Sequence, residues 1–259
     1  MPYVRYLFYV GHVTHFSHPS ILIHCHRPWL QEGDVDGKGW WASDEIKERR
    51  TNEMDAALVD NWNDVVGRKD MVYILGDFAW KNHSRFIQAV NGKKILILGN
   101  HDKMSQDVYS SFTEVYAGIK DINVKGQGVA LCHYPMYSWR GSNRGGWHFH
   151  GHTHNSPFRH PGMALNVGTD VHGYRPVSWE ELAEECVTKK IEQLSDKDAD
   201  NYRTPVKVAY QQIVSATTKA WYIETGFCGK KWFPKSPCVL DEENKIIKIP
   251  KWLKERMEL

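Results

Sequence analysis

Histidine stands out in this sequence, both in number and in placement. The chain has 14 histidines in 259 residues, and many gather in two segments, one at positions 12–26 and one alternating from His148 to His154. A single histidine is more often a surface or satisfied core residue than a ligand. Imidazole is nevertheless the commonest metal ligand and a common proton carrier near pH 7. The joint placement therefore predicts metal binding or acid–base chemistry.

Four short motifs add carboxylate and amide groups to this pattern. Each directly follows an apolar run: Gly76-Asp77, Gly99-Asn100-His101-Asp102, Cys132-His133 and Gly151-His152-Thr153-His154. Oxygen and nitrogen ligands without thiolate suit Mn²⁺, Zn²⁺, Fe or Ni²⁺, whereas Mg²⁺ and Ca²⁺ prefer more oxygen ligands. In an extended chain His152 and His154 would point the same way, so each could serve one of two ions about 3.5–4 Å apart. We therefore predict a binuclear metal site.

The apolar runs predict the elements that position these side chains. Buried strands are expected at 6–10, 71–75, 94–98, 129–132 and 147–150, and helices at 45–66 and 84–90. Alternating strands and helices are typical of a layered α/β domain, in which ligands lie beyond the carboxyl ends of the strands. Every motif falls at such an end, so one face of one sheet should collect them.

In their order and approximate spacing, the four motifs resemble those of the calcineurin-like metallophosphoesterases. The flanking residues at 75–80, 133–136 and 165–168 resemble the small prokaryotic and bacteriophage branch. The resemblance covers about residues 5–177 and implies a four-layer α/β/β/α sandwich, with helices outside two packed sheets. It also implies a hydrolase, a phosphodiesterase acting on a nucleotide or other small phosphorylated molecule. A cyclic nucleotide signal is a narrower candidate substrate.

Carried over onto this sequence, the resemblance assigns six ligands to two divalent ions, Mn²⁺ being favoured: His15, Asp77, Asn100, His133, His152 and His154. Asp77 would bridge the ions. Asn100 would also contact substrate, and His101 would donate a proton to the leaving oxygen. Asp102 would either fix the tautomer or raise the pKa of His101, or be a simple turn residue.

The first motif departs from the family pattern. The family has Asp-x-His after the first strand, whereas this chain has Val13-Thr14-His15. Valine cannot coordinate, so the first ion loses an anionic ligand. Three outcomes stay open: a weak or empty first site, with His12 or His18 as substitutes; a one-metal enzyme; or a phosphate-ligand binder that has lost catalysis.

Other candidate residues carry weaker signals. His18, Arg140 and Arg144 are candidate substrate contacts, because a guanidinium can bind phosphate through two hydrogen bonds. Surface solvation is the commoner role of such arginines. The cluster at 24–26 (His-Cys-His) is expected to pack or to contact substrate, and the histidines at 148 and 150 are expected to pack within the sheet.

Beyond residue 177 the sequence changes character. Ser178 and Glu181 fit a capping box that opens a helix toward Leu194. We therefore expect a metallophosphoesterase domain at 1–177, a helix and charged linker at 178–205, and a small β-rich module at 206–259. Aromatic and lysine residues at 219–224 and 231–236 could bind single-stranded nucleic acid. Core packing is the commoner use of such aromatics, so a nuclease or nucleic-acid-associated module is the less favoured alternative.

Composition limits the remaining classes. Lys and Arg number 33 against 31 Asp and Glu, a net charge of +2, so charge alone predicts no polyanionic partner. The five cysteines form no Cys-x-x-Cys pair, which argues against a disulfide framework or a thiolate zinc site. Apolar runs are far shorter than the roughly 18 residues of a membrane span. We expect a cytoplasmic protein with no membrane partner, and the oligomeric state is left open.

Overall fold

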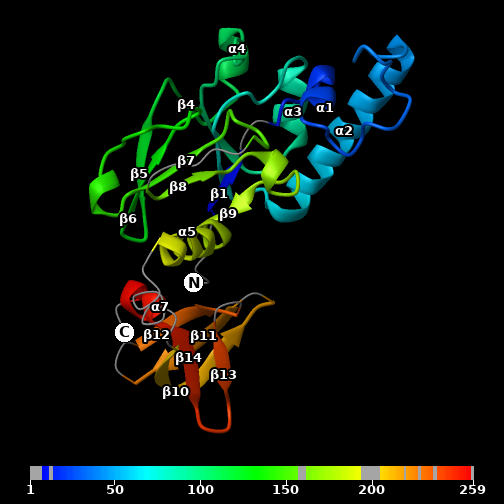
Figure 1. Ribbon diagram of the computed structural model, residues 1–259. Helices are drawn as coiled ribbons and strands as arrows, with labels where there is room; N and C mark the ends of the chain where they lie inside the picture. Colours follow the sequence, from blue (N-terminus) through cyan, green and yellow to red (C-terminus); the bar gives the residue numbers. More distant parts are fainter. Residues whose placement is uncertain are drawn as a thin grey trace. The chain divides into compact units, whose positions relative to one another are not determined.

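The computed structural model describes residues 8–11, 14–156, 162–193, 205–218, 220–226, 229–235 and 238–257. By its internal contacts the chain divides into two compact units, Met1–Cys186 and Val187–Leu259. Figure 1 shows the elements of each unit. His12 and Val13 of the first motif lie outside the described residues, as does most of the predicted linker, 194–204. The expected boundaries at 177 and 205 stay predictions.

The first unit contains a five-stranded sheet with a largely parallel arrangement. Its order is β4 (Glu114–Tyr116), β3 (Lys93–Ile97), β2 (Met71–Ile74), β1 (Phe8–Gly11) and β9 (Val177–Ser178). The pairs from β1 to β4 are parallel, and β9 runs antiparallel to β1. Three of the apolar runs predicted as strands, at 6–10, 71–75 and 94–98, therefore give strands of this sheet, with bounds shifted by one or two residues.

Helices cover one face of this sheet. They are α1 (Pro19–His24), α2 (Asp44–Val65) and α3 (His83–Ala89), and the one-turn α4 (Gln106–Tyr109) lies beside them. Met54, Leu58 and Trp62 are buried at a spacing of four residues, which places them on the inner side of α2. The two helices predicted at 45–66 and 84–90 are thus confirmed.

A second sheet packs on the other face. Its order is β5 (Lys120–Val124), β6 (Gln127–Leu131), β7 (Trp147–His150) and β8 (Ala164–Asn166), with β6, β7 and β8 parallel. One buried cluster joins the two sheets and includes Val10, Tyr73, Ile95, Leu131 and Phe149. Neighbouring residues of one strand belong to different clusters, because strand side chains alternate between faces.

The outer face of the second sheet is covered differently. Ala130 and Ala164 pack there with Trp139 and Met136 of the loop between β6 and β7. This loop contains one short turn, η1 (Ser142–Arg144). In the described part of the chain, the apolar residues on this face therefore come from a loop rather than from the helix that a four-layer sandwich would place there. The mixed α/β class is confirmed.

The predicted capping box begins α5 (Trp179–Gln193). The Ser178 amide donates to Glu181 Oε2 at 2.9 Å, and the Glu181 amide donates to Ser178 Oγ at 3.2 Å. Trp179, Leu182 and Cys186 join the cluster between the two sheets. The boundary between the two units falls within this helix, after Cys186.

The second unit is a small antiparallel sheet with one helix. Its order is β12 (Gly229–Pro234), β11 (Ala220–Thr225), β10 (Pro205–Ala216), β14 (Ile246–Pro250) and β13 (Val239–Asp241), followed by α7 (Lys251–Met257). Its own core contains Tyr210, Ile223, Phe233, Ile247 and Leu253. Several of the aromatic side chains thus serve packing.

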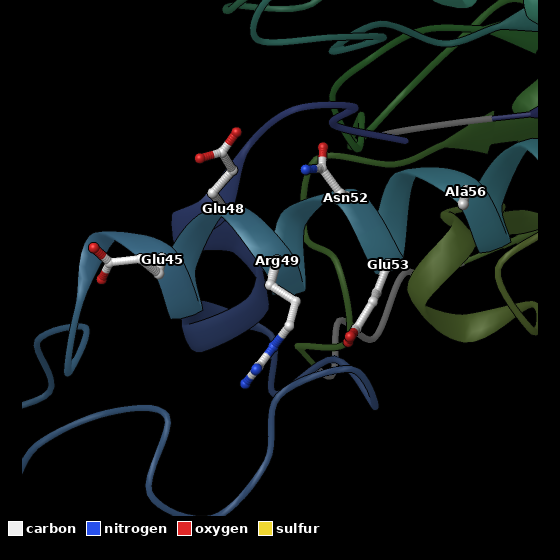
Figure 2. Close-up of a pocket in the computed structure, with 6 residues that line it drawn as sticks. All are labelled: Glu45, Glu48, Arg49, Asn52, Glu53 and Ala56. Atoms are coloured by element: carbon white, nitrogen blue, oxygen red, sulfur yellow. The ribbon is translucent and has the colours of Figure 1, made fainter.

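The outer side of α2 is polar. Figure 2 shows the residues that line a pocket along it, which are Glu45, Glu48, Arg49, Asn52, Glu53 and Ala56. None of these belongs to the motifs that carry chemistry. Within the described residues, no helix is both long and apolar enough to cross a membrane.

Candidate metal centre

The predicted ligands lie at the carboxyl ends of the central strands. Asp77 follows β2, Asn100 follows β3, His133 follows β6 and His152 follows β7. Parallel strands end at one edge of a sheet, and the two sheets pack face to face, so these four residues meet. The structure therefore brings these four residues together, at the ends of two packed sheets rather than of the single sheet that the sequence predicted.

His133 lies at the centre of the group and is buried. Its Nδ1 lies 2.9 Å from the carbonyl oxygen of Leu75, which can only accept, so Nδ1 carries a proton, and in the tautomer with this single proton Nε2 offers a lone pair. That Nε2 lies 2.9 Å from Asn100 Oδ1, 3.0 Å from His152 Nδ1 and 3.4 Å from Asp77 Oδ2. Two acceptor oxygens therefore face an acceptor nitrogen, an arrangement that a cation would stabilise.

These spacings fit a metal ion. Ligand atoms about 2.1 Å from an ion lie about 3.0–3.4 Å from one another in octahedral or tetrahedral geometry. Asp77, His133 and His152 have ligand atoms within 4.8 Å of one another and could hold an ion, and Asn100 Oδ1 adds a fourth. Burial and the neighbouring His133 lower the pKa of His152, which keeps its imidazole neutral and able to coordinate.

The glycines of these motifs are required by close backbone approach. A Cβ on Gly76 would lie 2.5 Å from the amide nitrogen of Gly99, and Gly76 has φ +88°. A Cβ on Gly99 would lie 2.4 Å from Asp77 Oδ1. The loops after β2 and β3 can therefore touch only because these positions carry no side chain.

Four predicted ligands have left-handed backbones. The φ angles are 50° at His15, 51° at Asp77, 60° at His152 and 49° at His154. The expectation of an extended chain through His152 and His154 was therefore wrong, because this segment forms a turn after β7. The two side chains diverge: His152 contacts His133, whereas His154 contacts Asp170.

Asp102 is an anchor for the loops of the site. Its Oδ2 accepts from the amides of Asp77 at 2.7 Å and Gly99 at 2.8 Å, and its Oδ1 accepts from Phe78 at 3.0 Å. Burial raises the pKa of Asp102, against the effect of these amides. Of the two roles that the sequence left open, the geometry is that of a turn residue.

His15 lies beside Asp77, and His154 stacks on His15. His15 Nε2 is 3.7 Å from Asp77 Oδ2, and the rings of His15 and His154 stack with centroids 5.2 Å apart. Burial and nearby positive groups lower the pKa of His15, so its ring is neutral. Within the described residues its buried Nδ1 has no hydrogen-bond partner. His15 thus adjoins Asp77, whereas the contacts of His154 are with His15 and Asp170.

His18 and His101 flank the group at its exposed side. His18 Nδ1 accepts from the amide of Ile21 at 3.1 Å and so caps α1. This use was not foreseen, and burial lowers the pKa of His18 to about 4. The exposed His101 lies 5.1 Å from the ring of Trp80 and 5.9 Å from that of His15.

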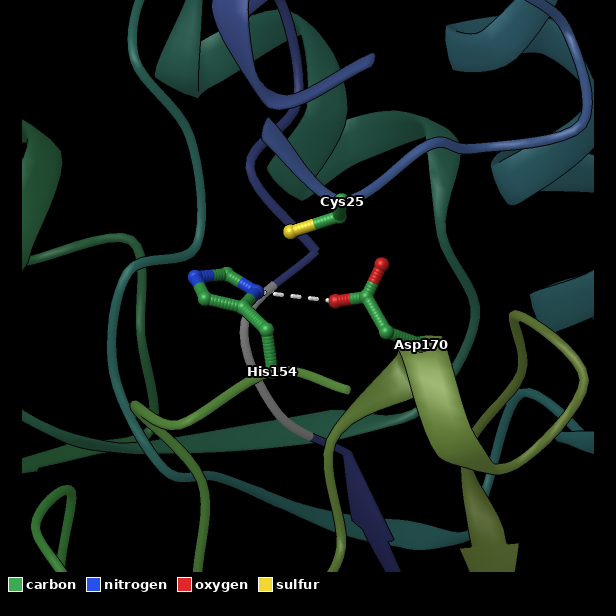
Figure 3. A group of neighbouring side chains, drawn as sticks. All are labelled: Cys25, His154 and Asp170. Carbon is green, nitrogen blue, oxygen red and sulfur yellow. Dashed lines mark hydrogen bonds and ion pairs between the residues drawn. The ribbon is translucent and has the colours of Figure 1, made fainter. Parts of the chain in front are cut away.

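Two residues of the site were missed by sequence reasoning. Asp170, on the short η2 turn (Thr169–Val171) that follows β8, accepts from His154 Nδ1 at 2.9 Å (Figure 3). Arg27 donates to both oxygens of Asp170, at 2.8 and 3.1 Å. Burial opposes ionisation, but bonds from His154 and Arg27 hold the pKa of Asp170 below its usual range. Its position after β8 was the available signal.

Cys25 joins this second group, although its neighbours at 24 and 26 do not. Cys25, His154 and Asp170 form a cluster within reach of one ion. His24 and His26 are exposed, so the segment is no zinc cluster in itself. Burial raises the pKa of the Cys25 thiol to about 11, which keeps it protonated near neutral pH.

Arg140 and Arg144 do not join the site. They line a depression with the β5–β6 hairpin, and Arg140 pairs with Asp121 at 3.7 Å. Because β6 and β7 are parallel, the connecting loop must cross the sheet from the carboxyl end of β6 to the amino end of β7. The prediction that these arginines clamp phosphate was therefore wrong.

His148 and His150 serve packing, as predicted. Both are buried, and His148 Nδ1 lies 3.0 Å from the carbonyl oxygen of Ala130. The Met136 amide donates to His148 Nε2 at 3.1 Å. Both nitrogens of this ring are therefore engaged away from the metal group.

Comparison with known proteins identifies relatives of this chain. No family model matches the sequence. It is 32% identical over 176 residues to uncharacterized protein MJ1445 of Methanocaldococcus jannaschii, covering 64% of this chain and 82% of that protein. It is 30% identical over 165 residues to the gene 66 protein of Mycobacterium phage L5, covering 50% of this chain and 79% of that protein. The chain belongs to the family of these two proteins.

A solved structure shares the fold. The crystal structure of the protein of unknown function AQ665 from Aquifex aeolicus matches with a TM-score of 0.51 and 24% identity. The match covers 70% of this chain and 100% of that one. At this identity the likeness concerns the fold alone.

Proposed function

We propose that the protein is a metal-dependent phosphoesterase, and more narrowly a phosphodiesterase of the calcineurin-like metallophosphoesterase class. The observation that carries the proposal is the convergence of Asp77, Asn100 and His152 on Nε2 of His133. The order of the four motifs supports the class. Two packed sheets with ligands at their strand ends are consistent with the sandwich that this class implies, although the outer helical layer is replaced by a loop in the described residues.

The donor set supports two divalent transition ions. Asn100, His133 and His152 would hold one ion, His15 and His154 the other, and Asp77 would lie between them. Mn²⁺ fits the mixture of imidazole and oxygen ligands, and Zn²⁺, Fe or Ni²⁺ are alternatives. When bound, such ions supply Lewis-acid chemistry, which lowers the pKa of water and neutralises charge on a phosphoryl group.

His101 is placed to supply the proton that the leaving oxygen needs. Its amide donates to Asp77 Oδ1 at 2.8 Å, so its backbone is fixed to the ligand that would lie between the ions. Its ring is exposed toward the side where substrate would enter. Histidine is suited to this transfer near pH 7 because its ordinary pKa is close to that value.

Two aromatic rings beside the ligands support a nucleotide substrate. Trp80 is 43% exposed and Tyr134 is 45% exposed. Trp80 lies 4.4 Å from the ring of His18, and Tyr134 lies 4.6 Å from that of His152. Exposed aromatic faces of this kind can stack on a nucleobase, while the ions would face its phosphate. A cyclic nucleotide is one member of this class.

Metal analysis and a substrate screen test the proposal together. The metal-free full chain is titrated with Mn²⁺ and assayed against phosphomonoesters, phosphodiesters and cyclic nucleotides. We expect phosphodiester hydrolysis that disappears in excess EDTA and returns with Mn²⁺. Full activity in protein shown by elemental analysis to hold no metal would overturn the proposal. Substrate binding without turnover at any metal concentration would instead identify a phosphate-ligand binder, the alternative suggested by Val13.

A further inference from the structure

We propose that Asp170 is a positioning residue of the metal centre, which with Arg27 fixes the tautomer and direction of His154. The inference rests on the proposed metal-binding site, not on the reaction catalysed there. Figure 3 shows the His154 ring with one nitrogen toward Asp170 and the other on the far side. The Arg27–Asp170–His154 chain links residues that are up to 143 positions apart.

The first step concerns the His154 proton. Its Nδ1 lies 2.9 Å from Asp170 Oδ2, and an ionised carboxylate can only accept. Nδ1 therefore carries a proton, which leaves Nε2 as the nitrogen that could coordinate an ion. The side chain of Asn166 donates to the His154 carbonyl at 2.6 Å, which holds the backbone at its left-handed angle. Ring stacking on His15 limits the remaining rotation.

The second step concerns the rigidity of Asp170. Arg27 binds it with two bonds of 2.8 and 3.1 Å, and the two side chains are 0% and 1% exposed. Arg27 Nη1 also donates to the carbonyl of Thr14 at 3.0 Å, next to His15. One guanidinium therefore anchors the chain segments of both predicted ligands of the second ion. A buried ion pair is in itself weak support for stability, so a positional role accounts for it better.

The third step separates positioning from direct coordination. Asp170 belongs to a cluster with Cys25 and His154 that could hold an ion. Both of its oxygens, however, already accept hydrogen bonds from Arg27, and the guanidinium charge would repel a cation placed against them. A carboxylate behind a ligating histidine increases the electron density on the opposite nitrogen. The ion held by His15 and His154 loses an anionic ligand, because Val13 stands where the family has an aspartate. Asp170 would thus supply negative charge near this ion.

The experiment compares two buried bidentate Arg–Asp pairs in the same unit. Asp170→Asn is the test, and Asp34→Asn is the matched control, because Arg50 binds Asp34 with bonds of 2.7 and 3.3 Å. Isothermal titration of the metal-free full chain with Mn²⁺ gives the affinity at each site. We expect Asp170→Asn to weaken the weaker-bound ion by about 10–100-fold while the tighter ion and the control are unchanged.

A second measurement uses the unmodified protein and does not depend on a variant that folds. The ¹⁵N chemical shifts of the metal-free wild type report which His154 nitrogen carries the proton, and we expect Nδ1. A proton on Nε2 overturns the inference. So does wild-type affinity at both sites in Asp170→Asn, or an equal loss in Asp34→Asn.

The outcomes also separate this inference from the proposed function. Two bound Mn²⁺ ions that respond to Asp170, without hydrolysis of any ester, would refute the phosphoesterase and keep the positioning role. Hydrolysis by the wild type, with Mn²⁺ affinity unchanged in Asp170→Asn, would do the reverse.

Discussion

The ionisation of Asp55 should couple the stability of this protein to pH. Asp55 lies on the inner side of α2, is 2% exposed, and accepts from the Ser17 amide at 2.8 Å and the Ser17 hydroxyl at 3.1 Å. It therefore holds the loop that carries His15 and His18. Burial raises its pKa to about 6, although the Ser17 bonds and the charges of Arg85 and Arg27 act in the opposite direction.

The sign and size of the effect follow from this pKa. An unfolded aspartate has a pKa of about 3.9, so between about pH 4 and pH 6 the folded protein binds a proton that the unfolded chain has released. The free energy of unfolding should therefore decrease as pH rises through this interval. At about 1.4 kcal/mol per pKa unit, a difference of about 2 corresponds to about 3 kcal/mol at neutral pH.

Asp55→Asn tests the reasoning because its amide can retain both Ser17 contacts without a charge. We expect urea unfolding to give nearly equal stabilities for wild type and variant near pH 4, and a variant about 3 kcal/mol more stable above pH 7. Asp60→Asn is the matched control, because it makes the same charge change at an exposed position of the same helix. The measured quantity is the free energy of unfolding of Asp55→Asn minus that of wild type. A smaller value at pH 8 than at pH 4 would refute the argument.

The remaining predictions concern the proposed centre. His101→Ala should lower turnover by roughly 10²–10⁴-fold with unchanged metal content, since in the proposed function the ring would act as an acid and not as a ligand; loss of ions in elemental analysis would contradict this. His133→Ala should abolish binding of the tighter Mn²⁺ ion in calorimetry, because its Nε2 is the point on which three other ligands converge. Val13→Asp should raise occupancy of the weaker site, measured by anomalous scattering; equal, stoichiometric occupancy of both sites in the Val13 protein would show that another residue replaces the missing carboxylate.

Much of the site could be predicted because several ligands directly follow a strand in the sequence. Asp77, Asn100 and His133 each follow an apolar run, and the parallel arrangement of such runs brings their ends together. The direction of His154 could not be predicted in this way. Its left-handed backbone opposes the local preference of a non-glycine residue and is held by contacts from distant segments.

The errors have a related origin. Arg144 is close in sequence to β7, the strand that precedes His152 and His154. Because Arg144 comes before β7, it lies at the opposite end of this strand from the two histidines. Arg27 and Asp170 are separated by 143 positions, so no spacing in the sequence indicates their pairing. Loops that cross a sheet and ion pairs between distant segments depend on topology, which the residue pattern specifies only in outline.

Stability and the proposed function make opposite demands on four residues with left-handed backbones, which are His15, Asp77, His152 and His154. A non-glycine residue in this conformation costs about 1–2 kcal/mol, and glycine relieves most of that cost. Selection of random variants for thermostability alone should therefore enrich glycine or asparagine at these four positions. Glycine at any of these positions would remove a ligand of the proposed centre, and asparagine in place of Asp77 would remove its negative charge. At these four positions, higher stability and metal binding therefore require different residues.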